Sequence, residues 1–387
     1  MVATRHRSEP HPFLPHSDPP HPPSFHSPPS FHSALPTCEY PPQRNGIKED
    51  DERIAGIVAG LKEDDAPLSY GEFEKIRKKS NLIDCALTEQ LVVPDFEDFC
   101  GDVYEIYEET KKDTSGENAD YIPQLARVDP ELYGVSVCTI DGQRYDVGDS
   151  HHYFCVQSCS KPITYMIAHE SLGEEKVHYH VGREPSGRAF NEVCLDDRKK
   201  KNDEEDIAQQ RAEALHIPDA PRRAEVLRAL DERVVRPAVP HNPLINAGAI
   251  MCASMVKPEA AMSDRFDYTM SVWRDLCGCT PTSPPHKRPT FANSVYLSES
   301  ATADRNWCLG FLMQEELAFP EGTNLKDTLE FYFMCCSIEV TSAMMSCVAA
   351  TLANGGLNPI NGKRIFSPRT VRNALSLMFS CGMYDYR

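Results

Sequence analysis

The sequence contains no apolar run that approaches the roughly 18 residues needed to cross a membrane. It also lacks an excess of basic residues: 40 Lys and Arg against 58 Asp and Glu give a formal net charge of -18. A nucleic-acid partner would require a basic face that neutralises phosphates. The composition therefore argues against both a membrane protein and a nucleic-acid-binding protein.

The 15 cysteines lack the spacing of a metal site or of a disulfide framework. Cys277 and Cys279 are too close together for a zinc knuckle, and no C-x-x-C pair completes one. The acidic residues also lack the order of an EF-hand calcium loop. We therefore expect no metal, and we expect reduced thiols, most of them buried as small apolar side chains.

The N-terminal residues are mostly proline, histidine and serine. They lack the apolar segment of a secretory signal, and they make a poor mitochondrial transit peptide because Arg5 and Arg7 stand almost alone. On composition we predict a disordered tail over residues 1–48. The alternative is a metal-binding tract, since histidines recur between the prolines at His6, His11, His16, His21, His26 and His32.

After this tail we predict a small helical domain over residues 49–112 and a main domain over 119–387 with a charged insertion at 197–238. In the small domain, Ser69-Tyr70-Gly71-Glu72 has the pattern of a capping box, and Asp95 precedes a second helical pattern. The insertion is most simply a solvated face, and we expect one surface helix in it, beginning near Asp219.

The main domain begins with a hairpin. Val135–Ile140 is predicted to be a strand, Asp141-Gly142 a type I′ turn, and Gln143–Val147 the returning strand. Near the end of the chain, Ser337 is predicted to cap a helix that ends at Asn354-Gly355-Gly356.

A final helix is expected to start at Ser367-Pro368, where a cap residue precedes a proline, and to run to Cys381-Gly382.

The chemically informative stretch follows the hairpin. Ser158 lies three residues before Lys161, a spacing that places both side chains on one face of a helix. Pro162 restricts this pair to the first helical turn, where free backbone amides and a positive dipole favour a nucleophilic serine with a lysine base. This is the S-x-x-K arrangement of serine β-lactamases. The alternative is a helix start with Ser158 as a cap and Lys161 in solvent.

A second polar position lies among small apolar residues. Asn246 begins the sequence Asn246-Ala247-Gly248-Ala249-Ile250. An asparagine in this setting is a helix cap, a hydrogen-bonded core amide or a residue that orients a substrate.

Together, several motifs in one order resemble the animal-type glutaminase family over roughly residues 65–387. They are Tyr121-Ile122-Pro123-Gln124-Leu125, Gln157-Ser158-Cys159-Ser160-Lys161-Pro162, Val181 to Gly187, Asn242-Pro243, Asn246 to Ile250, Asp304-Arg305-Asn306, Phe331-Tyr332-Phe333, Leu352 to Gly356 and Cys381 to Asp385. The resemblance implies an α/β (α+β) fold, with a β-lactamase-like or penicillin-binding-like domain and an all-α subdomain. It also implies hydrolysis of L-glutamine to L-glutamate and ammonia, without a cofactor.

The resemblance also implies roles for individual residues. Ser158 would attack the side-chain amide and form a glutamyl ester, Lys161 would accept its proton, and Tyr384 would relay protons near the pair. The substrate would be held by Tyr121, Gln157, Asn246, Glu299, Asn306, Tyr332 and Tyr384. Glutamine carries an ammonium and a carboxylate on one carbon, so such a site needs one acid and several hydrogen-bond donors.

Two regions depart from the family pattern. Lys199 to Ala238 has no counterpart in the family. The family also continues beyond the motif that contains Tyr384, into further strands, a Lys-Ser-Gly segment and a valine whose amide completes an oxyanion hole, whereas this sequence stops at Arg387. We therefore expect a sheet without its C-terminal strands and impaired turnover, since the loss of one oxyanion donor costs about a hundred- to a thousand-fold.

Other readings stay open. One is a β-lactamase-like or peptidase-like serine hydrolase, and another is a non-catalytic assembly partner of a full-length glutaminase. By resemblance we expect a homotetramer activated by phosphate, with the loop Gly187–Cys194 near the subunit contact. The resemblance also suggests the mitochondrial matrix, with the cytosol as the alternative.

Overall fold

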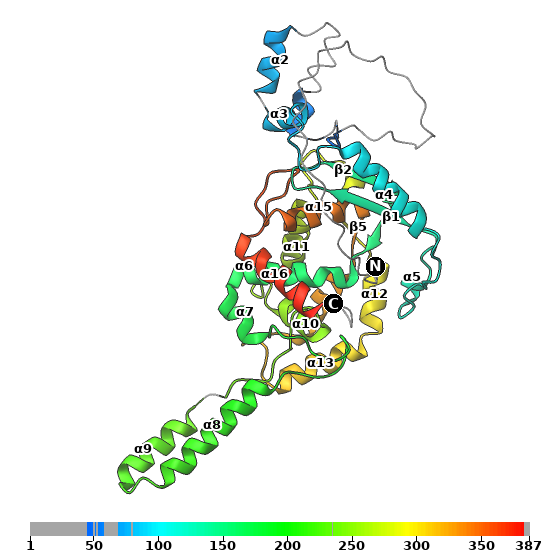
Figure 1. Cartoon of the computed structure of the whole chain (residues 1–387). Coiled ribbons are helices and arrows are strands. Elements are labelled where there is room, and N and C mark those ends of the chain that lie inside the picture. The colour runs from blue at the N-terminus through cyan, green and yellow to red at the C-terminus, as the bar shows by residue number, and fades with distance from the viewer. Residues whose placement is uncertain are drawn as a thin grey trace, which may run out of the picture. The chain divides into compact units, whose positions relative to one another are not determined.

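A computed structural model describes residues 45–48, 51, 53–57, 69–78, 80–233 and 235–382 (Figure 1). The chain divides into Met1–Pro41, which lies outside the described residues, and the compact unit Pro42–Arg387, to which everything below refers. The predicted tail lies almost entirely outside the described residues, and its disorder and the metal-binding alternative stay predictions.

Helices dominate the described part of the chain. They are α2 (Tyr70–Arg77), α3 (Asn81–Leu87), α4 (Phe96–Thr110), α5 (Pro123–Ala126), α6 (Ser160–Leu172), α7 (Glu174–His180), α8 (Arg198–Leu215), α9 (Ala220–Asp231), α10 (Asn246–Ser254), α11 (Met262–Leu276), α12 (Asn293–Ala301), α13 (Asp304–Glu315), α14 (Leu325–Cys336), α15 (Ser342–Ala353) and α16 (Pro368–Cys381). Short 3-10 helices cover Gln157–Cys159 and Pro285–Lys287.

Two small antiparallel sheets accompany these helices. One pairs β1 (Gly134–Cys138) with β2 (Arg144–Gly148), and the other has the order β3–β5–β4. The second sheet is formed by β3 (Phe154–Cys155), β4 (Thr290–Phe291) and β5 (Ile338–Val340). This mixed, helix-rich architecture confirms the predicted fold class.

The hairpin is confirmed, but the predicted type I′ turn is wrong. The amide of Gly142 donates to the Thr139 carbonyl at 3.0 Å, which makes Ile140 and Asp141 the central residues of the turn. Only Gly142 has a positive φ, +89°, whereas a type I′ turn requires positive φ at both central residues. With the Thr139 amide bonded to the Gln143 carbonyl, the loop is a three-residue connection closed by a glycine bulge.

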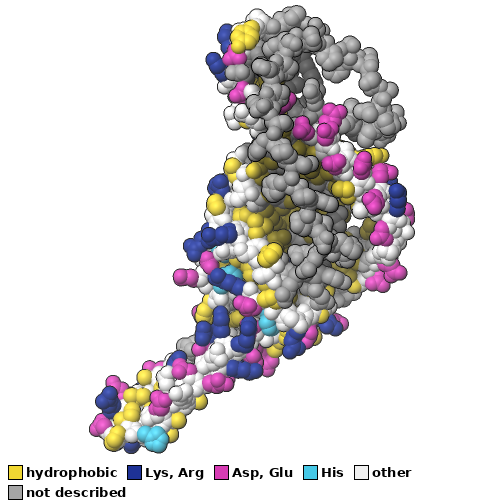
Figure 2. Space-filling view, viewed as in Figure 1, with side chains coloured by type: hydrophobic (Ala, Val, Ile, Leu, Met, Phe, Trp, Pro, Cys, Tyr) yellow, Lys and Arg dark blue, Asp and Glu magenta, His cyan; other side chains and the backbone are white. Residues whose placement is uncertain are grey.

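The charged insertion contains two helices rather than the single helix that we expected. Figure 1 shows α8 and α9 as an antiparallel pair extending away from the other helices, and Figure 2 shows both signs of charge mixed over it. Ion pairs such as Arg233–Asp206 and Arg236–Asp203, both 2.7 Å, link the pair to the segment after it. The run 198–215 reads as polar on every side, so helical periodicity did not reveal it.

Helices start where predicted after Ser69, Asp95, Asp219 and Ser367, and the predicted start at Ser337 is wrong. The Ser367 hydroxyl accepts from the Thr370 amide ahead of Pro368, and α16 ends at Gly382 as predicted. Asp95 precedes α4, although its side chain makes no capping hydrogen bond.

Ser337, by contrast, ends α14 instead of starting α15, because strand β5 follows it and Thr341 supplies the cap of α15.

The predicted small helical domain includes α2, α3 and α4, and it contacts the hairpin. Tyr107 of α4 stacks on Tyr133 with ring centroids 5.3 Å apart, and the backbone amide of Val93 donates to the Gln143 side chain at 3.0 Å. Asp51 is buried and pairs with Arg53 at 2.7 Å and with Arg144 of β2 at 3.3 Å. The domain boundary near residue 112 stays a prediction.

The core is centred on α6, α10 and α14. Every residue of α10 after Asn246 is buried, because small residues at its start let the neighbouring chain approach. At Gly248 a Cβ would lie 1.8 Å from the carbonyl oxygen of Asn242, so any larger residue would displace this backbone. This close packing fixes the start of α10 and therefore the position of Asn246.

The described residues contain neither a candidate membrane-spanning helix nor a candidate group of metal ligands. None of its helices combines the length and apolarity needed to cross a membrane. Among the same residues, no three His, Cys, Asp or Glu side chains gather in a way that could hold a metal ion.

Candidate active site

The turn that carries Ser158 connects a strand to a helix. Strand β3 pairs with β5, and the buried Val156 donates its amide to the Ile338 carbonyl at 2.8 Å. Gln157 then adopts a positive φ of +47°, a strained conformation for a residue with a side chain, and such conformations gather at functional sites. Ser158 therefore lies on a backbone turn that the sheet anchors on one side and α6 on the other.

Lys161 is placed as predicted, in the first turn of α6 and one residue before Pro162. Its side chain is 1 % exposed, so it is not the solvent-exposed lysine of the alternative interpretation. Its Nζ donates to Asn246 Oδ1 at 2.8 Å and lies 5.4 Å from the centre of the Phe190 ring. Burial lowers the pKa of Lys161 to about 8, which makes a neutral amine accessible near physiological pH.

Asn246 has partners on both sides of its amide group. Besides accepting from Lys161, it donates Nδ2 to Asn306 Oδ1 at 3.1 Å, and its backbone amide donates to the Phe190 carbonyl at 2.9 Å. Its side chain makes no helix-capping bond, so of the three possibilities raised by the sequence the cap is excluded. The result is a polar row, Lys161–Asn246–Asn306, contributed by α6, α10 and α13.

A second polar group surrounds Glu299 of α12. The Tyr121 hydroxyl lies 2.6 Å from Gln157 Oε1 and 2.8 Å from Glu299 Oε1. Glu299 is buried, and burial raises its pKa while the hydrogen bond from Tyr121 and the neighbouring Gln157 amide oppose the shift. A carboxylate that keeps two neutral polar partners in a low-dielectric site binds a cation strongly when one enters.

Tyr332 and Cys336 of α14 lie between these two polar groups. The two side chains are one helical turn apart, and Cys336 Sγ lies 4.0 Å from Ser160 Oγ. Burial and the charge of Glu299 raise the pKa of the Cys336 thiol to about 12, against the opposing charge of Lys161. Burial raises the pKa of Tyr332 as well, so both groups are neutral hydrogen-bonding partners at pH 7.

Contacts thus link most of the residues proposed from sequence. Lys161, Asn246 and Asn306 form one network, Tyr121, Gln157 and Glu299 form another, and Ser158 directly follows Gln157. Tyr332 approaches both networks through Cys336. Tyr384 lies outside the described residues, and its role stays a prediction.

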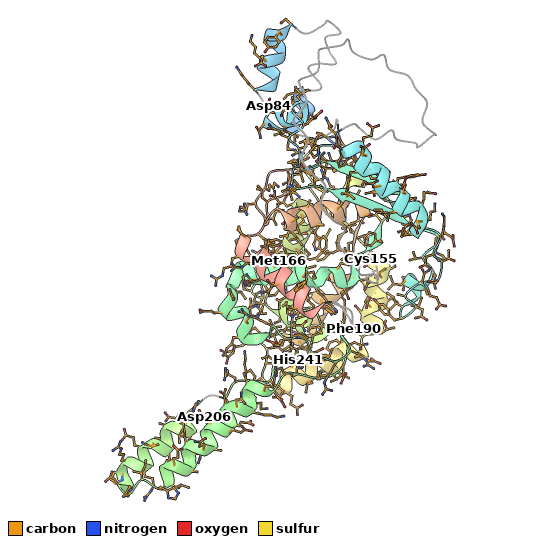
Figure 3. All side chains as sticks on the ribbon, viewed as in Figure 1. Asp84, Cys155, Met166, Phe190, Asp206 and His241 are labelled. Carbon is orange, nitrogen blue, oxygen red and sulfur yellow. The ribbon has the colours of Figure 1, made fainter. Side chains whose placement is uncertain are left out.

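Two contributors were not anticipated. Phe190, labelled in Figure 3, lies beside the Lys161 amine and fixes the backbone of Asn246, although no periodicity marks its loop. Cys336 could have been found from its spacing, four residues after Tyr332 on the same helix.

The sequence of the chain matches a known protein family. The family profile described as glutaminase matches residues 116–208 and 226–387. Putative glutaminase 3 of Caenorhabditis elegans is 41 % identical over 354 residues, covering 88 % of this chain and 53 % of that protein. The mitochondrial liver isoform of glutaminase from Mus musculus is 39 % identical over 305 residues, covering 79 % of this chain and 43 % of that protein.

Solved structures agree with these sequence relatives. Mglu in its native form superposes with a TM-score of 0.56 at 27 % identity, covering 73 % of this chain and 56 % of Mglu. A protein described as a probable glutaminase superposes with a TM-score of 0.57 at 26 % identity, covering 73 % and 77 %. These neighbours have the β-lactamase-like fold, which confirms that part of the fold prediction. The chain spans about half the length of the curated relatives that it matches.

Proposed function

The chain belongs to the glutaminase family, and on that basis we propose that it cleaves the side-chain amide of L-glutamine to give L-glutamate and ammonia. The observation that carries the proposal is the buried Lys161, whose lowered pKa and fixed position suit it to accept a proton from the nearby Ser158. The cation-binding carboxylate of Glu299, joined through Tyr121 to the residue before Ser158, supports an amino acid as the substrate.

In the proposed reaction the Ser158 oxygen attacks the amide carbon of glutamine while neutral Lys161 takes the hydroxyl proton. The tetrahedral adduct then collapses, the carbon–nitrogen bond breaks, and the leaving nitrogen receives that proton and departs as ammonia. Water hydrolyses the resulting glutamyl ester, which releases glutamate and restores the serine. Tyr332 and Tyr384 are proposed to relay protons during these steps.

Substrate recognition follows from the charges of glutamine. Glu299 is proposed to bind the α-ammonium group, with Tyr121 holding the carboxylate side chain of Glu299 in place. The α-carboxylate is assigned to the amide nitrogens of Asn246 and Asn306 and to the Tyr332 hydroxyl. The Asn246 amide is already oriented by Lys161, so little ordering is needed on binding.

The test is covalent labelling with a diazoketone analogue of glutamine, followed by peptide mapping. We expect modification of Ser158, protection by glutamine, and release of ammonia from glutamine by the unmodified chain. Ser158→Ala should abolish labelling, whereas Ser171→Ala, near the end of α6, should not. Modification at another residue, or none, would overturn the proposal. Acylation of Ser158 by penicillin in place of the diazoketone would favour a β-lactamase-like hydrolase, and assembly with a full-length glutaminase without labelling would favour a binding partner.

We also propose a mitochondrial location and a homotetramer that phosphate activates. The first is supported by the names of the mouse and rat relatives, both mitochondrial liver isoforms. Sedimentation of the purified chain with and without phosphate tests the second, and a monomer under both conditions would contradict it. Cell fractionation tests the location, and a purely cytosolic chain would contradict it.

A further inference from the structure

Gln157, the residue before the proposed nucleophile, has an unusual backbone conformation for its place in the fold. The described part of the chain has four non-glycine residues with positive φ. Three of them, Glu89, Lys257 and Leu317, follow the ends of α3, α10 and α13, where a left-handed residue commonly ends a helix. Gln157 instead precedes α6, so a helix end does not account for its φ of +47°. Such a conformation persists only where surrounding contacts hold it.

The hydroxyl group of Ser160 makes a contact of this kind. Its Oγ donates to the Gln157 carbonyl oxygen at 2.7 Å, and the backbone amide of Ser160 donates to the same carbonyl. One residue therefore supplies two donors to the strained turn. The peptide plane that carries the Gln157 carbonyl also carries the Ser158 amide, so the orientation of this plane sets the backbone of the nucleophile.

Ser160 is itself fixed by its surroundings. It is 1 % exposed, so water does not replace its hydroxyl group. Its carbonyl accepts from Thr164 Oγ1 at 3.0 Å within α6, and its Oγ lies 4.0 Å from Cys336 Sγ of α14. The turn connects Cys155 of β3 to α6, which carries Met166, and both of these residues are labelled in Figure 3. The Ser160 hydroxyl is thus a fixed donor between α6, α14 and the turn.

We propose that Ser160 is a positioning residue, whose hydroxyl holds the strained Gln157 turn and thereby aims the Ser158 oxygen at the substrate. The proposal rests on the proposed function, in which Ser158 is the nucleophile. The Ser160 hydroxyl keeps its own proton throughout the reaction. Backbone strain and one hydrogen bond have comparable free energies, so without the bond the turn relaxes into conformations that misdirect the nucleophile. A displacement of about 1 Å is enough to slow a reaction.

A second serine with the same kind of hydrogen bond provides the control. Ser254 ends α10 and is 2 % exposed, and its Oγ donates to the carbonyl of Met251, three residues earlier, at 2.7 Å. The two hydrogen bonds therefore match in length, burial and sequence spacing. Met251 lies inside α10, so Ser254→Ala removes an equivalent bond without releasing a strained turn.

The experiment measures the rate of Ser158 labelling by the diazoketone over a range of probe concentrations, in the full chain and in both variants. Ser160→Ala should lower the maximal rate about tenfold, the value of one hydrogen bond. The half-saturating probe concentration should stay unchanged, because Lys161 keeps its bond to Asn246 and Glu299 keeps its bond from Tyr121. Ser254→Ala should be labelled like the parent chain.

Hydrogen exchange and melting temperature separate positioning from general stability. Exchange over residues 154–165 should be faster in Ser160→Ala than in the parent and unchanged in Ser254→Ala. The two variants should have similar melting temperatures, since each loses one buried hydrogen bond.

The outcomes distinguish this proposal from the proposed function. Equal maximal rates for the parent and Ser160→Ala would overturn the positioning role and leave the proposed function intact. An equal fall in rate in Ser160→Ala and Ser254→Ala would show a purely structural role and would overturn it as well. Absence of Ser158 labelling from the parent chain would overturn the proposed function, and the positioning role with it.

Discussion

At the scale of the residue, Lys161 is the group whose surroundings matter most. It is buried, its Nζ donates to the Asn246 amide, and the side chain packs beside an aromatic ring. Removal from water penalises the charged ammonium, which is why the pKa falls to about 8. The same amine in solvent would stay protonated at neutral pH and could not act as a base.

The first prediction concerns pH. A lysine base works only when neutral, and its neutral fraction increases as pH rises through its pKa. The rate of Ser158 labelling by the diazoketone should therefore increase through about pH 8 and fall about tenfold for each pH unit below it. Stopped-time labelling at saturating probe measures this, with the melting temperature as a check that the fold persists. A flat rate across this range would contradict the assignment of Lys161 as the base.

The second prediction concerns Glu299. Glu299→Gln keeps the shape and the hydrogen bond with Tyr121 but removes the negative charge proposed to bind the α-ammonium group. Glutamine affinity should fall by about 10- to 100-fold, the usual value of a charged hydrogen bond. Calorimetric titration in the Ser158→Ala background isolates binding from reaction. Glu316→Gln, at a partly exposed ion pair with Lys200, is the control and should bind normally.

At the scale of the element, the start of α10 sets the geometry. Its small residues allow the backbone at Asn242 to lie almost against the helix, and this positions Asn246 between Lys161 and Asn306. Glycine is needed at position 248 for space and not for its dihedral freedom, since a Cβ there would overlap a carbonyl oxygen.

The third prediction compares two helical glycines. Gly248→Ala should lower the free energy of unfolding by about 2 kcal/mol or more, because overpacking forces the backbone apart. Gly101→Ala on the exposed face of α4, where a Cβ meets nothing within 4 Å, should instead raise it by about 0.5–1 kcal/mol through helix propensity. Urea denaturation measures both. Equal effects would show that the contact with Asn242 is not limiting.

At the scale of the whole unit, the α8–α9 pair is an appendage. We call the two chain segments that join it to the core its base. Asp196 and Val239 pair across that base, with backbone bonds of 2.7 and 3.1 Å, while Lys200–Glu316, at 2.6 Å, joins α8 to α13. Asp206, labelled in Figure 3, belongs to the ion pairs within the appendage. Residues 209–225, which the family profile leaves unmatched, all lie within it. Its origin as an insertion stays a prediction.

The fourth prediction is that this appendage can be removed. Replacing residues 199–235 with a short Gly-Ser linker keeps the Asp196–Val239 bridge, so the melting temperature and Ser158 labelling should change little. A deletion that also removes Asp196 and Val239 should lower the melting temperature. The backbone bridge that holds together the segments following α7 and preceding α10 is then lost. Loss of the folded core in the first deletion would show that α8 and α9 support it.

The sequence by itself determined the local features. Cap residues and breakers marked some of the helix ends, as at Ser367 and Gly382, because hydrogen bonds within a few residues decide such positions. Motif order also led to the proposed site residues, of which the structure joins Lys161, Asn246 and Asn306 in one network. Two local features were misassigned from the sequence. They are the type of the Asp141-Gly142 turn and the role of Ser337, which ends one helix and does not cap the next.

Only the tertiary structure decided what those side chains experience. The burial that lowers the pKa of Lys161 comes from α6, α10 and the Phe190 loop together, which are far apart in the chain. Desolvation and contact between distant segments depend on the packed neighbourhood, and no local pattern of residues specifies that neighbourhood.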